Sequence, residues 1–144
     1  MTKSLALLSL AFAASLPAAA RDATVTITLE SVLAMPAAKA KLDGSVKFYL
    51  AGASPRDGKR FGEAMANVKT NAFNKTPEEA CRWAALDALI KLESHARREG
   101  AVAIVDIVSY NQQQAFSSPA NVQCVEGTFL GGIALKGAYV KSGK

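Results

Sequence analysis

The first half of the chain contains two segments in which apolar and polar residues alternate, and a third, alanine-rich segment that also predicts a strand. Residues 24–29 place valine, isoleucine and leucine on one side and threonines on the other, residues 46–50 repeat the alternation, and an alanine-rich run lies within residues 61–71. This alternation is typical of strands with one buried face. Residues 35–42 predict a short helical turn, and residues 51–60, rich in glycine, proline and charge, predict an exposed loop.

A long helix is the strongest local prediction. Thr76 is suited to the N-cap, Pro77 to the first helical position, and Glu79 completes a capping box. Apolar residues then recur at helical spacing up to Glu99, and Gly100 supplies the C-cap. The main apolar stripe consists of Cys81, Ala85, Ala88, Leu89, Leu92 and Ala96.

The segment after this helix predicts a return to strands. Residues 101–109 are almost continuously β-branched, which suits a strand buried on both faces. The polar residues 111–121 predict a loop, and residues 122–126 and 129–140 predict a final strand or strand pair whose glycines indicate bulges or close packing. The predicted fold class is α+β: a mainly antiparallel sheet of about five strands, covered by one long helix.

The N-terminus resembles an export signal. Within residues 1–20, Lys3 is followed by the uncharged apolar residues 4–16, and the alanines 18–20 form a small-residue cleavage site. The apolar run of about 13 residues is shorter than the roughly 20 needed to span a bilayer. We therefore expect cleavage after Ala20, a periplasmic location, no transmembrane segment after cleavage, and a single domain over residues 21–144.

The positive charge is concentrated in one stretch of sequence. The 144-residue chain carries a formal net charge of +5, of which Lys3 contributes one. Residues 39–69 contain seven basic side chains against three acidic ones. Their difference of +4 equals the net charge of the whole chain once Lys3 is removed. These basic residues are Lys39, Lys41, Lys47, Arg56, Lys59, Arg60 and Lys69. They predict either contact with an anionic envelope surface or acidic protein, or ordinary solvation of a surface loop; nucleic acid is not expected in that compartment.

Two cysteines, Cys81 and Cys124, would meet an oxidising compartment after export. Neither belongs to a C-x-x-C motif and His95 is distant in sequence, so a zinc site or thioredoxin-like site lacks its usual pattern. Cys81 lies in the first turns of a helix about 34 Å long, and the next strand runs back beside it. If the polar loop then forms a hairpin, Cys124 reaches the same end, which predicts a disulfide between helix and strand; a free reactive thiol is the alternative.

No residue pattern predicts catalysis. Asp106 lies within a predicted strand, where a buried carboxylate would need a cation or several donors. It would therefore pair with a lysine or arginine at a sheet edge, or contact a ligand, and Glu126, two residues after Cys124, is a second candidate ligand contact. His95 is expected on the surface near the helix end, and Ser117 and Ser118 lack a nucleophile-elbow context. We expect no enzyme, no cofactor and no metal ligands.

Five segments, residues 41–49, 69–75, 79–84, 105–110 and 132–137, carry a resemblance. They resemble a family of small exported proteobacterial proteins that automated labelling often calls "excinuclease ATPase subunit". The chain has no phosphate-binding G-x-x-x-x-G-K-[ST] loop and no zinc-finger cysteine set, which argues against that activity.

A more distant similarity lies in the order of the elements. A helix, Gly100, an apolar strand and a glycine-containing last strand are similar to small YbjQ-type domains and to the disulfide-bonded sensor lipoprotein of the Rcs envelope-stress pathway. The sequence thus predicts a non-enzymatic periplasmic binding or envelope-stress module. The alternative is a small-ligand or metal-binding domain that uses Asp106 and Glu126.

Overall fold

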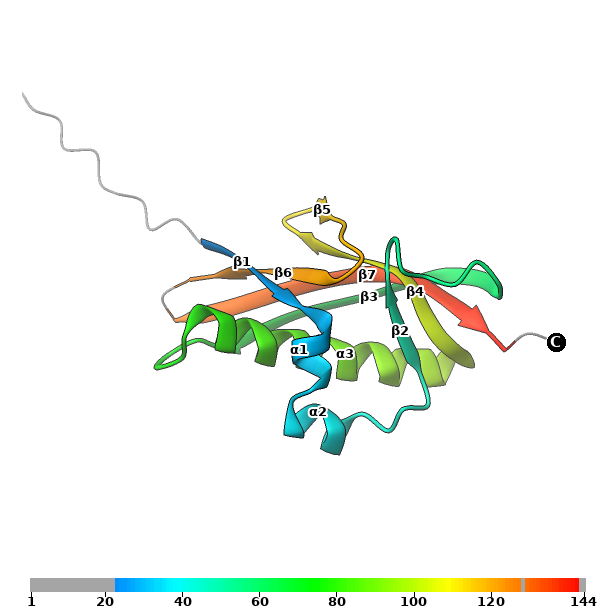
Figure 1. The fold of residues 1–144 in the computed structure, drawn as a ribbon, viewed down its shortest axis with the longest axis horizontal. Coiled ribbons are helices and arrows are strands. Elements are labelled where there is room, and N and C mark those ends of the chain that lie inside the picture. Colours follow the sequence, from blue (N-terminus) through cyan, green and yellow to red (C-terminus); the bar gives the residue numbers. More distant parts are fainter. Residues whose placement is uncertain (1–22, 128, 143–144) are drawn as a thin grey trace, which may run out of the picture.

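A seven-stranded sheet packed against one long helix forms the body of the structure (Figure 1). The computed structural model describes residues 23–127 and 129–142, so the predicted signal peptide, residues 1–20, lies outside the described residues. The elements are β1 (Ala23–Thr28), α1 (Leu29–Leu33), α2 (Pro36–Lys41), β2 (Lys47–Leu50), β3 (Lys59–Asn71), α3 (Pro77–Glu99), β4 (Ala101–Asn111), β5 (Gln114–Phe116), β6 (Asn121–Glu126) and β7 (Leu130–Lys141). Within this part of the chain, no helix is long and apolar enough to cross a membrane.

The long strand β7 is the centre of the sheet. One edge of β7 pairs with β3 along its whole length, while the other edge pairs with β6 at Gly131 and Gly132 and then with β4 from Leu135 onward. Outside these strands β1 pairs with β6, and both β5 and β2 pair with β4. Only the β2–β4 pair is parallel among the pairings described. The mainly antiparallel α+β arrangement is confirmed, but the predicted count of about five strands is too low.

The extra strand β5 lies in the segment predicted to be a loop, residues 111–121. Gln112 and Gln113 form a tight turn with φ angles of 53° and 62°, and Asn111 pairs with Gln114 across it. Two central residues with positive φ are typical of the two-residue hairpin turn, where Asn-Gly is the usual sequence. Because glutamine carries no such preference, the pattern of the chain did not indicate this hairpin.

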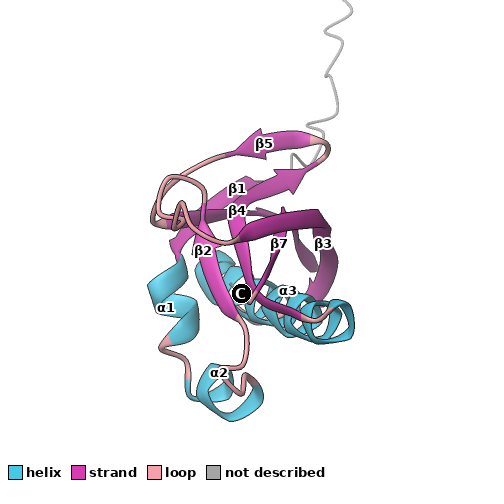
Figure 2. Ribbon diagram, turned by 90° about the vertical axis from the view of Figure 1, so that its right-hand side faces the viewer, coloured by secondary structure: helices cyan, strands magenta, loops and turns pink. Residues whose placement is uncertain are grey.

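Helix α3 has the predicted bounds and caps. The Thr76 hydroxyl accepts a hydrogen bond from the Glu79 N–H at 3.1 Å, and Gly100 adopts a left-handed φ of 71°. The helix packs one side against the sheet, chiefly against β3 and β7 (Figure 2). Its main apolar stripe, including Leu89 and Leu92, is fully buried there, and so is the neighbouring Leu86.

The strand predicted to be buried on both faces, β4, is interrupted. The Val102 side chain is 41% exposed, so the prediction is wrong at this position. At Asp106 the backbone has a φ of 55°, and the pairing with β7 shifts between Val105 and Val108. This bulge turns the Asp106 carboxylate outward.

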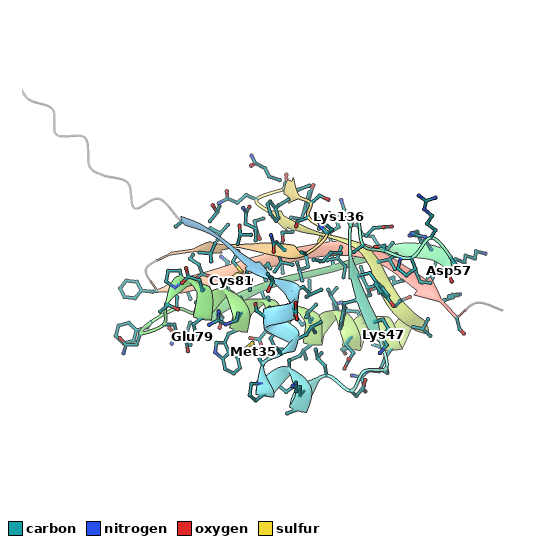
Figure 3. The ribbon with its side chains drawn as sticks, viewed as in Figure 1. Met35, Lys47, Asp57, Glu79, Cys81 and Lys136 are labelled. Atoms are coloured by element: carbon teal, nitrogen blue, oxygen red, sulfur yellow. A yellow bond between two sulfur atoms is a disulfide. The ribbon has the colours of Figure 1, made fainter. Side chains whose placement is uncertain are left out.

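The two faces of the sheet differ in what covers them. The α3 face is lined by small and aliphatic residues, such as Ala64, Ala66 and Val68 of β3. The opposite face, here called the open face, carries the alternate side chains of β3, of which Met65, Asn67 and Lys69 are examples. Figure 3 shows Lys136 of β7 on this side, away from α3. The open face is therefore where a partner or ligand can reach the sheet.

A side-chain bridge fills the point where β7 changes partner from β6 to β4. The Asn111 amide accepts a hydrogen bond from the Ala134 N–H at 2.7 Å and donates one to the Gln123 carbonyl at 2.6 Å. The buried Ser109 hydroxyl accepts from the Gln123 N–H at 2.8 Å. Since backbone groups without partners are costly, these side chains take the place of ladder bonds that β4 and β6 do not make to each other.

We expect Asn111→Ala to lower the free energy of unfolding by about 2–3 kcal/mol, because two backbone groups lose their partners at once. Urea denaturation followed by circular dichroism measures this change. Gln114→Ala, an exposed substitution in the same hairpin, is the control and should change stability by less than about 0.5 kcal/mol. Equal effects of the two substitutions would show that Asn111 does not hold the junction.

Candidate functional site

The predicted disulfide is present. Cys81 and Cys124 are bonded with a Cα–Cα distance of 5.6 Å, and both residues are fully buried. The bond joins the start of α3 to β6, and Figure 3 shows Cys81 between that end of the helix and the sheet. The predicted hairpin between the strand of residues 101–109 and the strand of Cys124 is only partly correct. In the sheet, β6 pairs with β1 and β7 and does not lie next to β4.

Glu126 lies beside the disulfide on the same face of β6 as Cys124. Its side chain is only 5% exposed, and neither carboxylate oxygen has a hydrogen-bond partner among the described residues. A carboxylate oxygen of Glu126 and the two sulfur atoms all lie within 4.8 Å of one another. Burial alone raises the pKa of the Glu126 carboxyl to about 7.

Gly131 of β7 provides the space for this carboxylate. A β-carbon on Gly131 would overlap both carboxylate oxygens of Glu126. The backbone of Gly131 also forms part of a pocket described below, so the glycine lies between the two sites. Glu126 and Gly131 are paired between β6 and β7, and the large side chain of Glu126 occupies the space that the missing side chain of Gly131 leaves.

Asp106 occupies a different place and has a different partner. Its carboxylate accepts a hydrogen bond from Arg60 Nε at 2.8 Å, and its N–H donates one to the Ser54 hydroxyl at 2.7 Å. The Arg60 hydrogen bond lowers the pKa of the Asp106 carboxyl. The predicted pairing with a basic residue is thus what the structure contains.

Asp106 and Glu126 do not form one site. Along β7, Glu126 pairs with Gly131, whereas the Asp106 bulge lies opposite the step between Lys136 and Ala138. At 3.3 Å per residue this separation is about 20 Å. His95 also lies elsewhere, half-buried toward the far end of α3, so the predicted candidates are not gathered into a common centre.

The seven basic residues of the charged stretch are all exposed but are spread over the molecule. Lys59 and Lys69 lie at opposite ends of β3, roughly 33 Å apart at 3.3 Å per residue. Arg60 is already paired with Asp106. The remaining members lie on α2, at the start of β2 and in the following loop, and are Lys39, Lys41, Lys47 and Arg56. A cluster in sequence is therefore not a single patch in space.

A pocket of about 590 Å³ opens on the open face around the start of β7. Its apolar lining includes Val125, together with Phe129 and Leu130, whose side chains are 65% and 57% exposed. Its polar lining consists of Asn67, Lys69, Asn111 and Gln112. Lys69 is the only charged residue among the described lining residues. The size lies within the usual range of small-ligand pockets.

The sequence did not predict this pocket. One signal was visible in retrospect: two large apolar residues, Phe129 and Leu130, stand immediately before the glycines 131 and 132. Glycines leave a depression where larger side chains would fill the face of the sheet. The remaining lining residues, such as Asn67 and Asn111, come from strands whose pairing with β7 could not be deduced from spacing.

The described residues thus contain two sites of chemical interest, one on each side of Gly131. On the α3 side, Cys81, Cys124 and Glu126 form the only group of three cysteine, histidine or acidic residues close enough to share an ion within the described part of the chain. On the open face, the pocket combines exposed apolar side chains with Lys69. No family model matches this chain, and neither the curated proteins nor the solved structures include a significant match.

Proposed function

We propose that this protein is an exported, non-enzymatic binding module whose open-face pocket takes an amphipathic molecule with an apolar body and an anionic group. The observation that carries the proposal is the lining of the pocket, in which the exposed side chains of Phe129 and Leu130 lie near a single cation, Lys69. Large apolar side chains left in solvent are typical of binding surfaces.

The distribution of charge favours a discrete ligand over a flat anionic surface. A membrane or polyanion is best held by many cations on one face, but the basic residues here are dispersed, and Lys59 and Lys69 occupy opposite ends of β3. A ligand with one anionic group needs only one well-placed cation. Lys69 pairs with Gly132 and Asn71 pairs with Leu130, so Lys69 lies two register positions from Leu130 of the apolar rim.

Export is part of the proposal. It rests on the predicted signal peptide, and the Cys81–Cys124 disulfide is compatible with an oxidising compartment. We propose binding and no reaction because of the side chains that line the pocket. The described lining residues include amides and one lysine but no acid, histidine or cysteine. Such groups bind and orient a ligand without supplying a nucleophile and base.

Binding of a dansylated eleven-carbon fatty acid tests the proposal, with fluorescence enhancement as the measurement. We expect saturable binding, weakened about tenfold by Lys69→Gln, the loss that corresponds to one charge-assisted hydrogen bond. Leu130→Asp should abolish binding because it places a charge on the apolar rim. Lys59→Gln is the matched control, since it removes the same charge from the other end of β3 and should leave the affinity unchanged.

The methyl ester of the same probe separates the two parts of the ligand. It should bind the unmodified protein more weakly than the acid, and Lys69→Gln should not weaken it further. A probe that does not bind, or that binds the Lys69 and Lys59 variants equally well, would refute the proposed ligand class.

A further inference from the structure

The group formed by Cys81, Cys124 and Glu126 lies on the α3 side of the sheet, away from the open-face pocket. Its three donor atoms come from α3 and β6 and are all within 4.8 Å of one another. From this arrangement we infer that the protein contains a second, reduction-dependent site, which binds a thiophilic divalent cation of the zinc class when the disulfide is open. This site is independent of the ligand proposed above.

The donor set fits the chemistry of zinc. Zn²⁺ in proteins takes cysteine sulfur at about 2.3 Å and carboxylate oxygen at about 2.0–2.2 Å, in tetrahedral geometry. Donor atoms around such an ion are about 3.5–3.8 Å apart. The two sulfur atoms, which are bonded to each other in this structure, must therefore move apart after reduction, whereas a Glu126 oxygen already lies within 4.8 Å of both. The sequence suggested no zinc site because it has no C-x-x-C motif and a distant His95; the third donor is instead a carboxylate brought in by the fold.

The state of Glu126 is the independent observation that points to a ligand. Its carboxylate is 5% exposed, faces the sulfur atoms, and has no hydrogen-bond partner among the described residues. A buried carboxylate without a partner is costly, and a cation is the partner that would offset this cost most fully. Gly131, where any side chain would overlap the carboxylate, leaves this position free for it.

The reaction that opens the site is a thiol–disulfide exchange. A dithiol reductant gives two electrons and two protons to the Cys81–Cys124 bond, which becomes two thiols, while the dithiol becomes a disulfide. The cation then displaces the two thiol protons, together with the Glu126 proton where it is present, and forms two metal–sulfur bonds and one metal–oxygen bond. The crosslink between α3 and β6 is thereby replaced by coordination, and one tetrahedral position remains for water.

Titration of the reduced mature chain with Cd²⁺ and Zn²⁺ tests this inference. A phosphine reductant keeps the cysteines reduced without adding a competing thiol. We expect a thiolate-to-cadmium charge-transfer band that saturates at one equivalent, and a rise in the melting temperature of the reduced protein with Zn²⁺. The oxidised protein and the Cys81→Ala, Cys124→Ala double variant should show neither response.

The role of Glu126 needs a variant that keeps both sulfurs. We expect Glu126→Gln to lower the Zn²⁺ affinity of the reduced protein at least about tenfold in competition with a chromogenic chelator, since one of three donors is lost. Glu93→Gln is the matched control, because Glu93 is equally buried on α3 but lies about 18 Å along the helix from Cys81 and should retain full affinity.

Three outcomes would overturn the inference. Absence of the charge-transfer band in the reduced protein would show that the sulfurs cannot take a cation. Equal Zn²⁺ affinities of the unmodified protein and Glu126→Gln would show that the two cysteines bind the cation without Glu126. Circular dichroism of the reduced protein that shows an unfolded chain, which Zn²⁺ does not refold, would show that the cation binds an unstructured pair of cysteines.

Discussion

Replacing both cysteines with alanine is expected to lower the free energy of unfolding by about 4 kcal/mol. The disulfide links residues 43 positions apart. Closing a loop of this length lowers the conformational entropy of the unfolded chain, which destabilises the unfolded state by about 4 kcal/mol. The effect is large because a domain of this size has a total stability of only about 5–15 kcal/mol. Alanine is preferred to serine, since a hydroxyl in these fully buried positions would lack a partner.

Urea unfolding of the oxidised protein and of Cys81→Ala, Cys124→Ala provides the measurement. The reduced protein, kept in chelator so that no cation binds, should match the double variant to within about 1 kcal/mol if the crosslink acts through the unfolded state. A stability loss below about 1 kcal/mol in both samples would mean that packing of α3 on β6 holds this end of the molecule without the covalent bond.

Local signals in the sequence predicted α3 well because they act within a few residues. Thr76 and Gly100 cap the helix by bonding to backbone groups three or four positions away, and the structure confirms both. The strands with clear alternation, such as β2, were also found, with Val46 and Leu50 of the expected side buried. The disulfide was predicted because two cysteines in a chain that is expected to be exported have only one intramolecular pairing.

The features that the sequence did not predict depend on which distant strands pair with each other. The bulge at Asp106 and the turn at Gln112 and Gln113 use positive φ angles in residues that carry no preference for them, so the carboxylate was assigned to a strand interior and β5 to a loop. The change of partner along β7 depends on Asn111, whose two hydrogen bonds join strands that lie apart in sequence. The open-face pocket, built on that junction, could not be predicted without the strand order.

Glu126 was a candidate from sequence, but for a different reason from the one that the structure provides. The sequence predicted that Glu126 and Asp106 could contact the same ligand. In the structure Asp106 lies about 20 Å away along the sheet and forms an ion pair with Arg60. The importance of Glu126 follows from its burial beside Cys124 and from the absence of a side chain at Gly131. Both facts depend on the pairing of β6 with β7.

Glu126 is expected to make the oxidised protein less stable as the pH rises from about 4.5 to about 7. Burial raises the pKa of its carboxyl from 4.5 in the unfolded chain to about 7 in the folded protein. Below pH 4.5 the group is protonated in both states. Between the two pKa values the folded protein retains a proton that the unfolded chain has lost, and above pH 7 the folded protein holds an ionised carboxylate in a buried place. At about 1.4 kcal/mol per pKa unit, the total loss is about 3 kcal/mol.

Glu126→Gln removes this titration, so the expected result is a difference in slope. Between pH 5 and pH 7.5, in chelator, the free energy of unfolding of the unmodified protein should fall by about 2.4 kcal/mol more than that of Glu126→Gln. The slope is the quantity to compare, because a buried amide has its own unsatisfied groups at every pH.

Asp106 and Asp43 have lowered pKa values, and the stability that they contribute is lost at pH values below this window. Glu63→Gln, on the exposed surface, should keep the slope of the unmodified protein. If Glu126→Gln keeps it as well, another group is responsible, and the carboxylate beside the disulfide is already compensated in solution.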